Sequence, residues 1–469
     1  MKELVDKDKE IEKILIDENN IEQLETDDND KPTTKEKIIY ILKGISSILS
    51  SMTSTFGHYS ILALGYSGIY LISFRYHYNR NLSYKYLYCF VPLINLALYI
   101  TAPFGGIISN RFGQKPTIFL SNLIICISLL FVYFSRSIYL DYILMYLIGF
   151  GIAISINITK INSCLYFINK KALILGIIYL IPNLLSGILI FYNEAIVINP
   201  DYDGPNIKCT FFEEKIFIKF NNAITLEIKI IIITCLATLV LYFKNNPKDT
   251  KKLGYNEKLP NENNNNDESE KIEKNKRKTS KILLLKKVIH NKRTIRLILM
   301  VMLFFPTITL ITNTLRMDDY MFFIYGAFYN LAGCISCLIF GLIGDCVRFK
   351  IVFIILSILL LLVPYTYIKW FENEFILVLE AMLISFVYNA FNIIFDSHIM
   401  KVYGIKNYNE MWGIIRSSRG ISEILGIILN VFLDYKNGIY KIIYGFAGCL
   451  SIISMGLSLY ENEDKFNYE

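Results

Sequence analysis

Residues 106–115 read GIISNRFGQK, and residues 341–350 read GLIGDCVRFK. Both stretches begin with glycine, carry Asn110 or Asp345 four residues later, and end on lysine. Each follows an apolar run, and each occupies the same place within its own half of the chain. Corresponding loops of this kind are typical of a chain built from two related bundles of helices.

The composition is that of a protein that crosses a membrane several times. The chain has 469 residues, of which 54% are hydrophobic and 19% charged, and its mean hydropathy is +0.41. Its apolar runs are about 20 residues long, the length of helix that crosses the hydrocarbon core of a bilayer. They are too long and too apolar for the strands of a membrane barrel, so we expect an all-α polytopic bundle.

Twelve such runs are recognisable, six on each side of a polar stretch. They lie near residues 45–73, 86–108, 117–135, 138–158, 173–193, 226–243, 295–315, 320–344, 351–369, 374–396, 411–433 and 439–460. The predicted organisation is a polar N-terminal tail (1–37), a first six-helix bundle (38–243), a linker (244–294), a second six-helix bundle (295–460) and a C-terminal tail (461–469). The linker is charged and of low complexity, so we expect a disordered cytosolic tether.

Basic residues predict the orientation. Lys and Arg concentrate in the short loops that face the cytosol if both ends of the chain lie there, among them Arg111, Lys160 and Arg348. The loop 74–85 also carries basic residues and is the exception. The positive-inside rule then predicts an integral, multi-pass protein of the plasma membrane or an organelle, with both termini cytosolic.

The repeated loop resembles the G-x-x-x-D-R-x-G-R-K motif of the major facilitator superfamily. The resemblance implies the superfamily fold and a role for the loop in gating movement between the two halves. The residues to which that role would pass are Gly106, Asn110, Arg111, Gly113, Gly341, Asp345 and Arg348. Asn110 stands where Asp is usual, which predicts a weaker contact between helices in the first copy. The alternative is that these basic residues only anchor the topology.

Two further segments resemble a narrower group. Residues 149–176 are similar to the W-F-P-x-K-R-G-L-A-x-G segment of oxalate:formate antiporter-like and monocarboxylate transporters, although the Pro is missing. Residues 403–420 are similar to the segment of that group that ends in Y-S-A-K-G. In that group the Lys binds a substrate carboxylate from the eleventh helix. Arg419 occupies the Lys position here.

Arg416, Arg419 and Glu423 lie inside the eleventh apolar run, where a charge near the bilayer centre costs about 2.5 to 3.5 kcal/mol on insertion scales. Their spacing places all three on one face of a helix. In a functional interpretation, Arg419 binds a substrate carboxylate in bidentate fashion, while Glu423 holds it in the empty site and takes up a proton when displaced. In a structural interpretation, Arg419 and Glu423 form a static pair and Arg416 extends to the interface.

Related carboxylate carriers also place an Arg on the eighth helix, four residues before the motif Gly, and Cys337 stands there in this chain. A single cation favours a substrate with one anionic group. The predicted function is secondary active transport of small organic anions, monocarboxylates first, by alternating access. The alternatives are an amino-acid or other zwitterion carrier of the same superfamily, and a non-transporting protein or subunit of an obligate hetero-oligomer.

Other polar residues inside the runs are candidates for the same site. Glu380 and Asp396, in the tenth run, are each a candidate partner for Arg416. Tyr59, Tyr66 and Tyr70, in the first run beside His58, are candidate substrate-binding hydroxyls. The chain contains 33 Tyr, so a tyrosine at such a position by chance is the competing explanation.

The sequence lacks the motifs of an enzyme. No phosphate-binding Gly loop, G-x-S-x-G or H-E-x-x-H is present, and the four His are scattered. Cys334 and Cys337 form a C-x-x-C pair inside an apolar run, where helix packing explains them better than a metal. We therefore expect no cofactor, no metal and no nucleic acid. The expected partners are an organic anion, a proton and the lipid bilayer, for a monomer or a chain with one partner subunit.

Overall fold

The computed structural model describes most of the chain as α-helix. The described residues are 34–66, 89–197, 214–245, 291–315, 322–370, 373–404, 407–432 and 439–461. Tyr70, nearly all of the expected linker and most of both tails lie outside them. The boundaries of the predicted domains therefore stay predictions.

The first half of the described chain contributes six long helices. They are α2 (Thr34–Tyr66), α4 (Phe90–Phe112), α5 (Gln114–Phe134), α6 (Ile138–Tyr166), α7 (Lys171–Val197) and α8 (Glu214–Leu241). The second half contributes α11 (Lys292–Leu315), α12 (Phe322–Ile343), α13 (Phe349–Trp370), α14 (Glu374–Val402), α15 (Tyr408–Ser417), α16 (Arg419–Phe432) and α17 (Ile439–Ser458). Each expected span coincides with a helix in this set, and the eleventh span coincides with two.

The described helices have the length and composition of membrane spans. Eight of those described are long and apolar enough to cross a bilayer, and parts of α8 and α17 form shorter apolar helices. Many large hydrophobic side chains point outward, as the lipid-facing side of such a helix requires. The chain is an all-α, multi-pass membrane protein.

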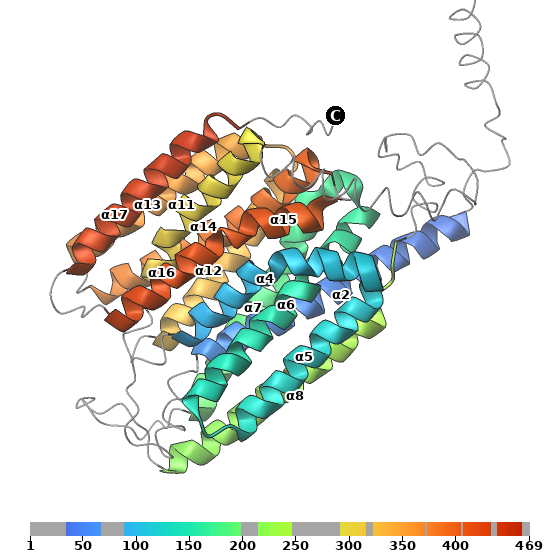
Figure 1. Cartoon of the computed structure of the whole chain (residues 1–469), viewed down its shortest axis with the longest axis horizontal. Helices are drawn as coiled ribbons and strands as arrows, with labels where there is room; N and C mark the ends of the chain where they lie inside the picture. Colours follow the sequence, from blue (N-terminus) through green and yellow to red (C-terminus); the bar gives the residue numbers. More distant parts are fainter. Residues whose placement is uncertain are drawn as a thin grey trace, which may run out of the picture.

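The two halves lie side by side and meet along two pairs of helices (Figure 1). On one side α4 packs along both α15 and α16, and on the other α7 packs along α12. Close approach depends on small residues. A Cβ atom added to Gly176 would lie 2.7 Å from the Cα of Gly341, and one added to Gly413 would lie 2.7 Å from the backbone of Pro103. The two interfaces are therefore built from backbone contacts that larger side chains would prevent.

The eleventh span is assigned as two helices, α15 and α16, that are separated only by Ser418, whose φ of −62° and ψ of −25° are helical values. The hydroxyls of Ser417 and Ser418 each donate to the carbonyl three residues earlier, at 2.7 Å. Side chains that hydrogen-bond back to helix carbonyls compete with the regular ladder and bend a helix. Helix α15 ends at Ser417, and α16 begins at Arg419.

The fourth span is longer than the sequence predicted. Lys160 was expected in a cytosolic loop, but α6 continues to Tyr166 and Lys160 is only 1% exposed. The error arose because a cation was taken to mark the end of an apolar run. Lys160 is instead part of the interior of the protein.

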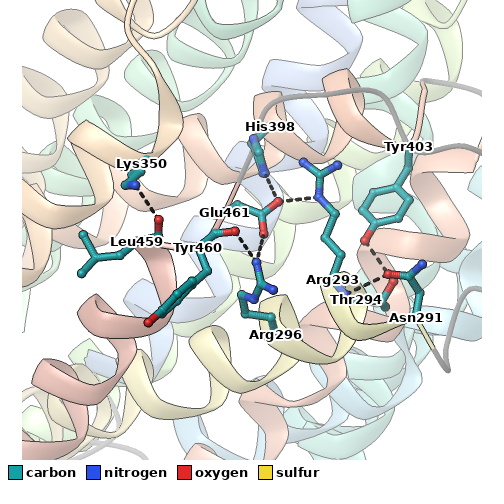
Figure 2. A network of polar contacts seen from close by, with 10 residues as sticks. All are labelled: Asn291, Arg293, Thr294, Arg296, Lys350, His398, Tyr403, Leu459, Tyr460 and Glu461. Carbon is teal, nitrogen blue, oxygen red and sulfur yellow. Dashed lines mark hydrogen bonds and ion pairs between the residues drawn. The ribbon is translucent and has the colours of Figure 1, made fainter.

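A polar network fastens the end of α17 to three neighbouring helices (Figure 2). The buried carboxylate of Glu461 lies 2.6 Å from Arg293 Nε, 3.9 Å from Arg296 Nη1 and 3.3 Å from His398 Nε2. Lys350 donates to the carbonyl of Leu459. These contacts tie α11, α13 and α14 together at one end of the second bundle.

Candidate functional site

Buried charged side chains gather where the two halves meet. Arg416, near the end of α15, is almost completely buried. Its two terminal nitrogens donate to Asn392 Oδ1 at 2.8 Å and to Asp396 Oδ1 at 3.1 Å. Its guanidinium carbon also lies 5.0 to 5.9 Å from four aromatic ring centroids, among them Phe305 and Trp412. Arg416 is thus held by a carboxylate, an amide and aromatic rings, although its Nε has no hydrogen-bond partner in the described part of the chain. It does not extend to an interface as the structural interpretation expected.

Asp396 connects the two halves. Its Oδ1 accepts hydrogen bonds from Arg416 and, at 2.8 Å, from Trp412 Nε1, both on α15. Its Oδ2 accepts a hydrogen bond from the hydroxyl of Tyr179, on α7, at 3.2 Å. The bond from Tyr179 crosses from the first half to the second. Asp396 thus accepts hydrogen bonds from both halves.

Lys160 approaches the same group from α6. Its Nζ donates to the Tyr179 hydroxyl at 2.5 Å and lies 4.6 Å from the centroid of the Tyr179 ring. Among the residues that the structure describes, no carboxylate lies within 4.0 Å of this ammonium group. Lys160, Tyr179, Asp396 and Arg416 therefore form one chain of polar contacts across the interface.

Arg419 opens α16 and occupies an aromatic cage. Its guanidinium carbon lies 4.1 Å from the ring centroid of Phe305, 4.3 Å from that of Tyr99 and 4.9 Å from that of Tyr388. Tyr99 belongs to the first half and the other two rings to the second. Its Nε donates to Glu423 Oε1 at 3.4 Å, while Nη1 has no hydrogen-bond partner in the described part of the chain. Glu423 is thus the one carboxylate that pairs with Arg419 among the described residues, and the contact is long.

The two charge clusters around Arg416 and Arg419 contain more buried positive than negative groups among the described residues. Their cations are Lys160, Arg416 and Arg419, and their carboxylates are Asp396 and Glu423. Removing a charge from water costs several kcal/mol unless a partner compensates it, and an unpaired buried charge is the most costly case. An anion that entered this region would supply the missing charge.

A cluster of amide groups lies beside the charges. The Tyr59 hydroxyl, on α2, donates to Asn389 Oδ1 at 3.2 Å, and Asn183 Nδ2, on α7, donates to the same oxygen at 3.1 Å. Both bonds cross between the halves. Next to Tyr59, the ring of His58 is buried without a hydrogen-bond partner among the described residues and lines a small cavity with Asn122 and several hydroxyls.

Three predicted site residues do not join these clusters. The side chain of Tyr66 and all of Tyr70 lie outside the described residues. Glu380 does not pair with Arg416, because it lies 16 residues before Asp396 on α14, which is about 24 Å along a helix. Its carboxylate makes no hydrogen bond with the residues described. The pairing expected for Glu380 is therefore wrong, and Asp396 takes that place.

The second copy of the loop motif makes a contact between the halves. Asp345 accepts hydrogen bonds from the backbone N–H groups of Ala172 at 3.0 Å and Leu173 at 3.3 Å. These groups begin α7, where unpaired N–H groups and the helix dipole favour an anion. Asp345 therefore caps a helix of the other half.

The first copy of the loop motif, residues 106–115, shows no comparable hydrogen bond between the halves among the described side chains. A Cβ atom added to Gly106 would lie 3.3 Å from Asn409 on α15, so the two halves approach closely there as well. The side chain of Asn110 lies outside what the structure describes. Arg111 and Arg348 are exposed and form no ion pair with the described residues. Gly113 has a φ of 87°, a left-handed value that favours glycine at the turn between α4 and α5.

Comparison with known proteins identifies the fold. Residues 228–427 match the family model described as the Major Facilitator Superfamily. The human organic anion transporter MFSD10 (TETRAN) has a similar structure, with a TM-score of 0.59 and 11% identity over 89% of this chain and 99% of that one. The proton:xylose symporter XylE of the major facilitator superfamily gives 0.56 and 13% identity over 89% of this chain and 94% of its own.

The nucleoside transporter NupG also has a similar structure. Its TM-score is 0.52 at 12% identity, over 89% of this chain and 99% of that one. None of the curated proteins compared with this sequence matches it significantly. The fold is that of the major facilitator superfamily.

Sequence reasoning missed several residues of the interface. Lys160 was assigned to a loop, and Tyr179, Asn392 and Trp412 were given no role. If the predicted fourth span had been extended past residue 158, Lys160 would have been recognised as a charge inside a membrane-spanning helix. Tyr179 had no such signal, because tyrosine is common throughout the chain.

Proposed function

We propose that the chain is a member of the major facilitator superfamily and a secondary active transporter of small organic anions. Rocking of the two bundles about a midplane site would expose that site to each side of the membrane in turn. The match over residues 228–427 and the fold support the membership. The charges at the interface support the anionic substrate.

The observation that carries the proposal is the excess of buried cations in the two charge clusters around Arg416 and Arg419. Three described cations face two carboxylates there, and the groups come from both halves. A bound anion would balance the excess and stabilise the state in which both halves contact it. A ligand shifts a conformational equilibrium only through such a difference in binding.

Arg419 is the group we assign to the substrate carboxylate. Arg416 already has Asp396 and Asn392 as close partners, whereas Arg419 has one carboxylate contact, at 3.4 Å, and a terminal nitrogen without a hydrogen bond among the described residues. A guanidinium binds a carboxylate through two parallel hydrogen bonds. Substrate would then replace Glu423 as the partner of Arg419. A monocarboxylate is the smallest substrate that meets this requirement.

Replacement of Arg419 by Gln tests the proposal. The purified chain in proteoliposomes should take up labelled pyruvate or lactate, and Arg419→Gln should reduce that uptake by at least about tenfold, since a hydrogen bond to a charged group contributes about 1.5 to 3 kcal/mol. Arg111→Gln is the matched control, because it removes an arginine that is exposed. Uptake that survives Arg419→Gln in folded protein would rule out the assigned role.

A zwitterion carrier is the second candidate, favoured by the position of Glu423. The carboxylate of Glu423 is buried beside Arg419 and would receive a substrate ammonium group while Arg419 held the carboxylate. Competition distinguishes the two candidates. Alanine should compete better than propionate for a zwitterion site, and propionate better than alanine for a monocarboxylate site.

A further inference from the structure

Lys160 is the most weakly compensated of the buried cations at the interface. It is 1% exposed, and its polar contacts are the hydroxyl and the ring of one tyrosine, Tyr179. A neutral hydroxyl does not cancel the charge of an ammonium group. Buried charges are ordinarily paired, since the alternative costs several kcal/mol. The position of Lys160 is therefore an expensive one that folding alone does not explain.

The other cations differ from Lys160 in their partners. Arg416 has a carboxylate, an amide and four aromatic rings around it, so an incoming anion would have to displace Asp396 to reach it. An anion at Lys160 would displace only a hydroxyl. Arg419 is intermediate, with its one long carboxylate contact, to Glu423. An anion that bound Lys160 or Arg419 would therefore displace fewer existing contacts than one that bound Arg416. These two cations belong to opposite halves of the molecule.

Lys160 and Arg419 belong to the same region of the interface. The rings of Phe305 and Tyr388 contact Arg419, and Phe305 also contacts Arg416, which joins Lys160 through Asp396 and Tyr179.

We propose that Lys160 is a second anion-binding group of the transport site and that the preferred substrates are small dicarboxylates. This inference rests on the proposed function and refines its substrate class. One carboxylate would bind Arg419, on α16 of the second half. The other would bind Lys160, on α6 of the first half, and displace the Tyr179 hydroxyl. A substrate held at both ends by opposite halves would favour the state in which they close around it.

The proposal revises the substrate expected from sequence. Cys337 occupies the place where related carriers have a second cation, which favoured a monocarboxylate. Cys337 is indeed buried without a cationic neighbour among its described hydrogen-bond partners, and its sulfur lies 3.7 Å from Asn183 Nδ2. The second cation comes instead from α6. Its contribution was hidden because Lys160 was expected in a loop.

The decisive comparison changes the ligand and leaves the protein intact. Malonate, succinate and glutarate are each paired with their monoamide, which keeps the shape and removes one charge. We expect the purified wild-type chain to bind at least one dicarboxylate about tenfold more tightly than its monoamide, measured by ligand-induced thermal stabilisation. Equal binding within all three pairs would overturn the proposal without any variant.

Substitution of Lys160 then tests whether this residue causes the preference for a dicarboxylate over its monoamide. Lys160→Met should fold at least as stably as the wild type, because it removes, at similar volume, a buried charge that has no carboxylate in direct contact among the described residues. It should bind each dicarboxylate no better than its monoamide while retaining monoamide binding. Lys170→Met, which removes an exposed lysine close in sequence, should keep the preference. A dicarboxylate preference that persists in Lys160→Met would also overturn the proposal.

The outcomes separate this inference from the proposed function. If each dicarboxylate and its monoamide bind equally, and Arg419→Gln abolishes this binding, the inference about Lys160 fails. The proposed function then stands, with a substrate that has one anionic group. Absence of binding by any of these acids would remove the proposed function and the inference together.

Discussion

Arg416 and Asp396 illustrate how single residues stabilise this interface. Their ion pair is buried, and both partners make further hydrogen bonds, to Asn392, Trp412 and Tyr179. A buried pair contributes little compared with well-packed apolar residues, but removal of one partner leaves the other charge without compensation. We therefore regard Arg416 as a positioning residue that orders α15 against α14. Arg419, three residues later, is the group left for substrate.

Removal of the carboxylate alone should be strongly destabilising. We expect Asp396→Asn to lower the free energy of unfolding by about 3 to 5 kcal/mol, because Arg416 would remain buried without its counter-charge. Thermal unfolding in detergent measures the effect. The double variant Asp396→Asn with Arg416→Met should recover much of the loss. Additive losses in the double variant would show that the two residues are not energetically coupled.

At the scale of elements, most of the helices could be predicted because run length decides which segments cross a bilayer. The length of α6 could not. Charge was taken to end a span, so α6 was cut before Lys160, although a cation can be buried beside a tyrosine ring. The residues of the site depend on which helix faces meet, and periodicity within one helix does not reveal that.

The network around Glu461 provides a test at this scale. Glu461→Gln should lower the stability of the second bundle by about 1 to 3 kcal/mol, since its buried carboxylate accepts a charge-assisted hydrogen bond from Arg293 on α11 and lies close to His398 on α14. Arg348→Gln removes an exposed charge without an ion pair in the described chain and serves as control. Equal melting temperatures for the Glu461→Gln variant and wild-type protein would show that these contacts are not structural.

At the scale of the whole molecule, the two bundles meet through backbone contacts and a small number of polar bridges. Asp345 caps α7 at one end, and Tyr59, Asn183 and Tyr179 form hydrogen bonds with α14 deeper in the interface. Each of these bridges joins groups of opposite halves. Alternating access would require some of them to break and re-form, and their small number keeps that cost low.

Close packing of α7 on α12 makes the conformational prediction specific. Gly176→Val would place a side chain where even a Cβ lies 2.7 Å from the Cα of Gly341. We expect the variant to be expressed and folded but to transport at a small fraction of the wild-type rate, because the halves could not close at this point. Gly456→Val is the control, since nothing lies within 4 Å of its added Cβ. Normal uptake by Gly176→Val would show that this contact does not form during transport.

The central claim is that a guanidinium on the eleventh span binds the substrate anion between the two halves. Its most direct test is Arg419→Cys in a background without other cysteines, treated with a water-soluble, positively charged thiol reagent. We predict that the variant is inactive, that the cysteine reacts, that anionic substrate in excess slows the reaction, and that the attached cation restores part of the transport. A cysteine that remains unreactive under all conditions, with or without substrate, would show that this position never meets the aqueous pathway and would contradict the claim.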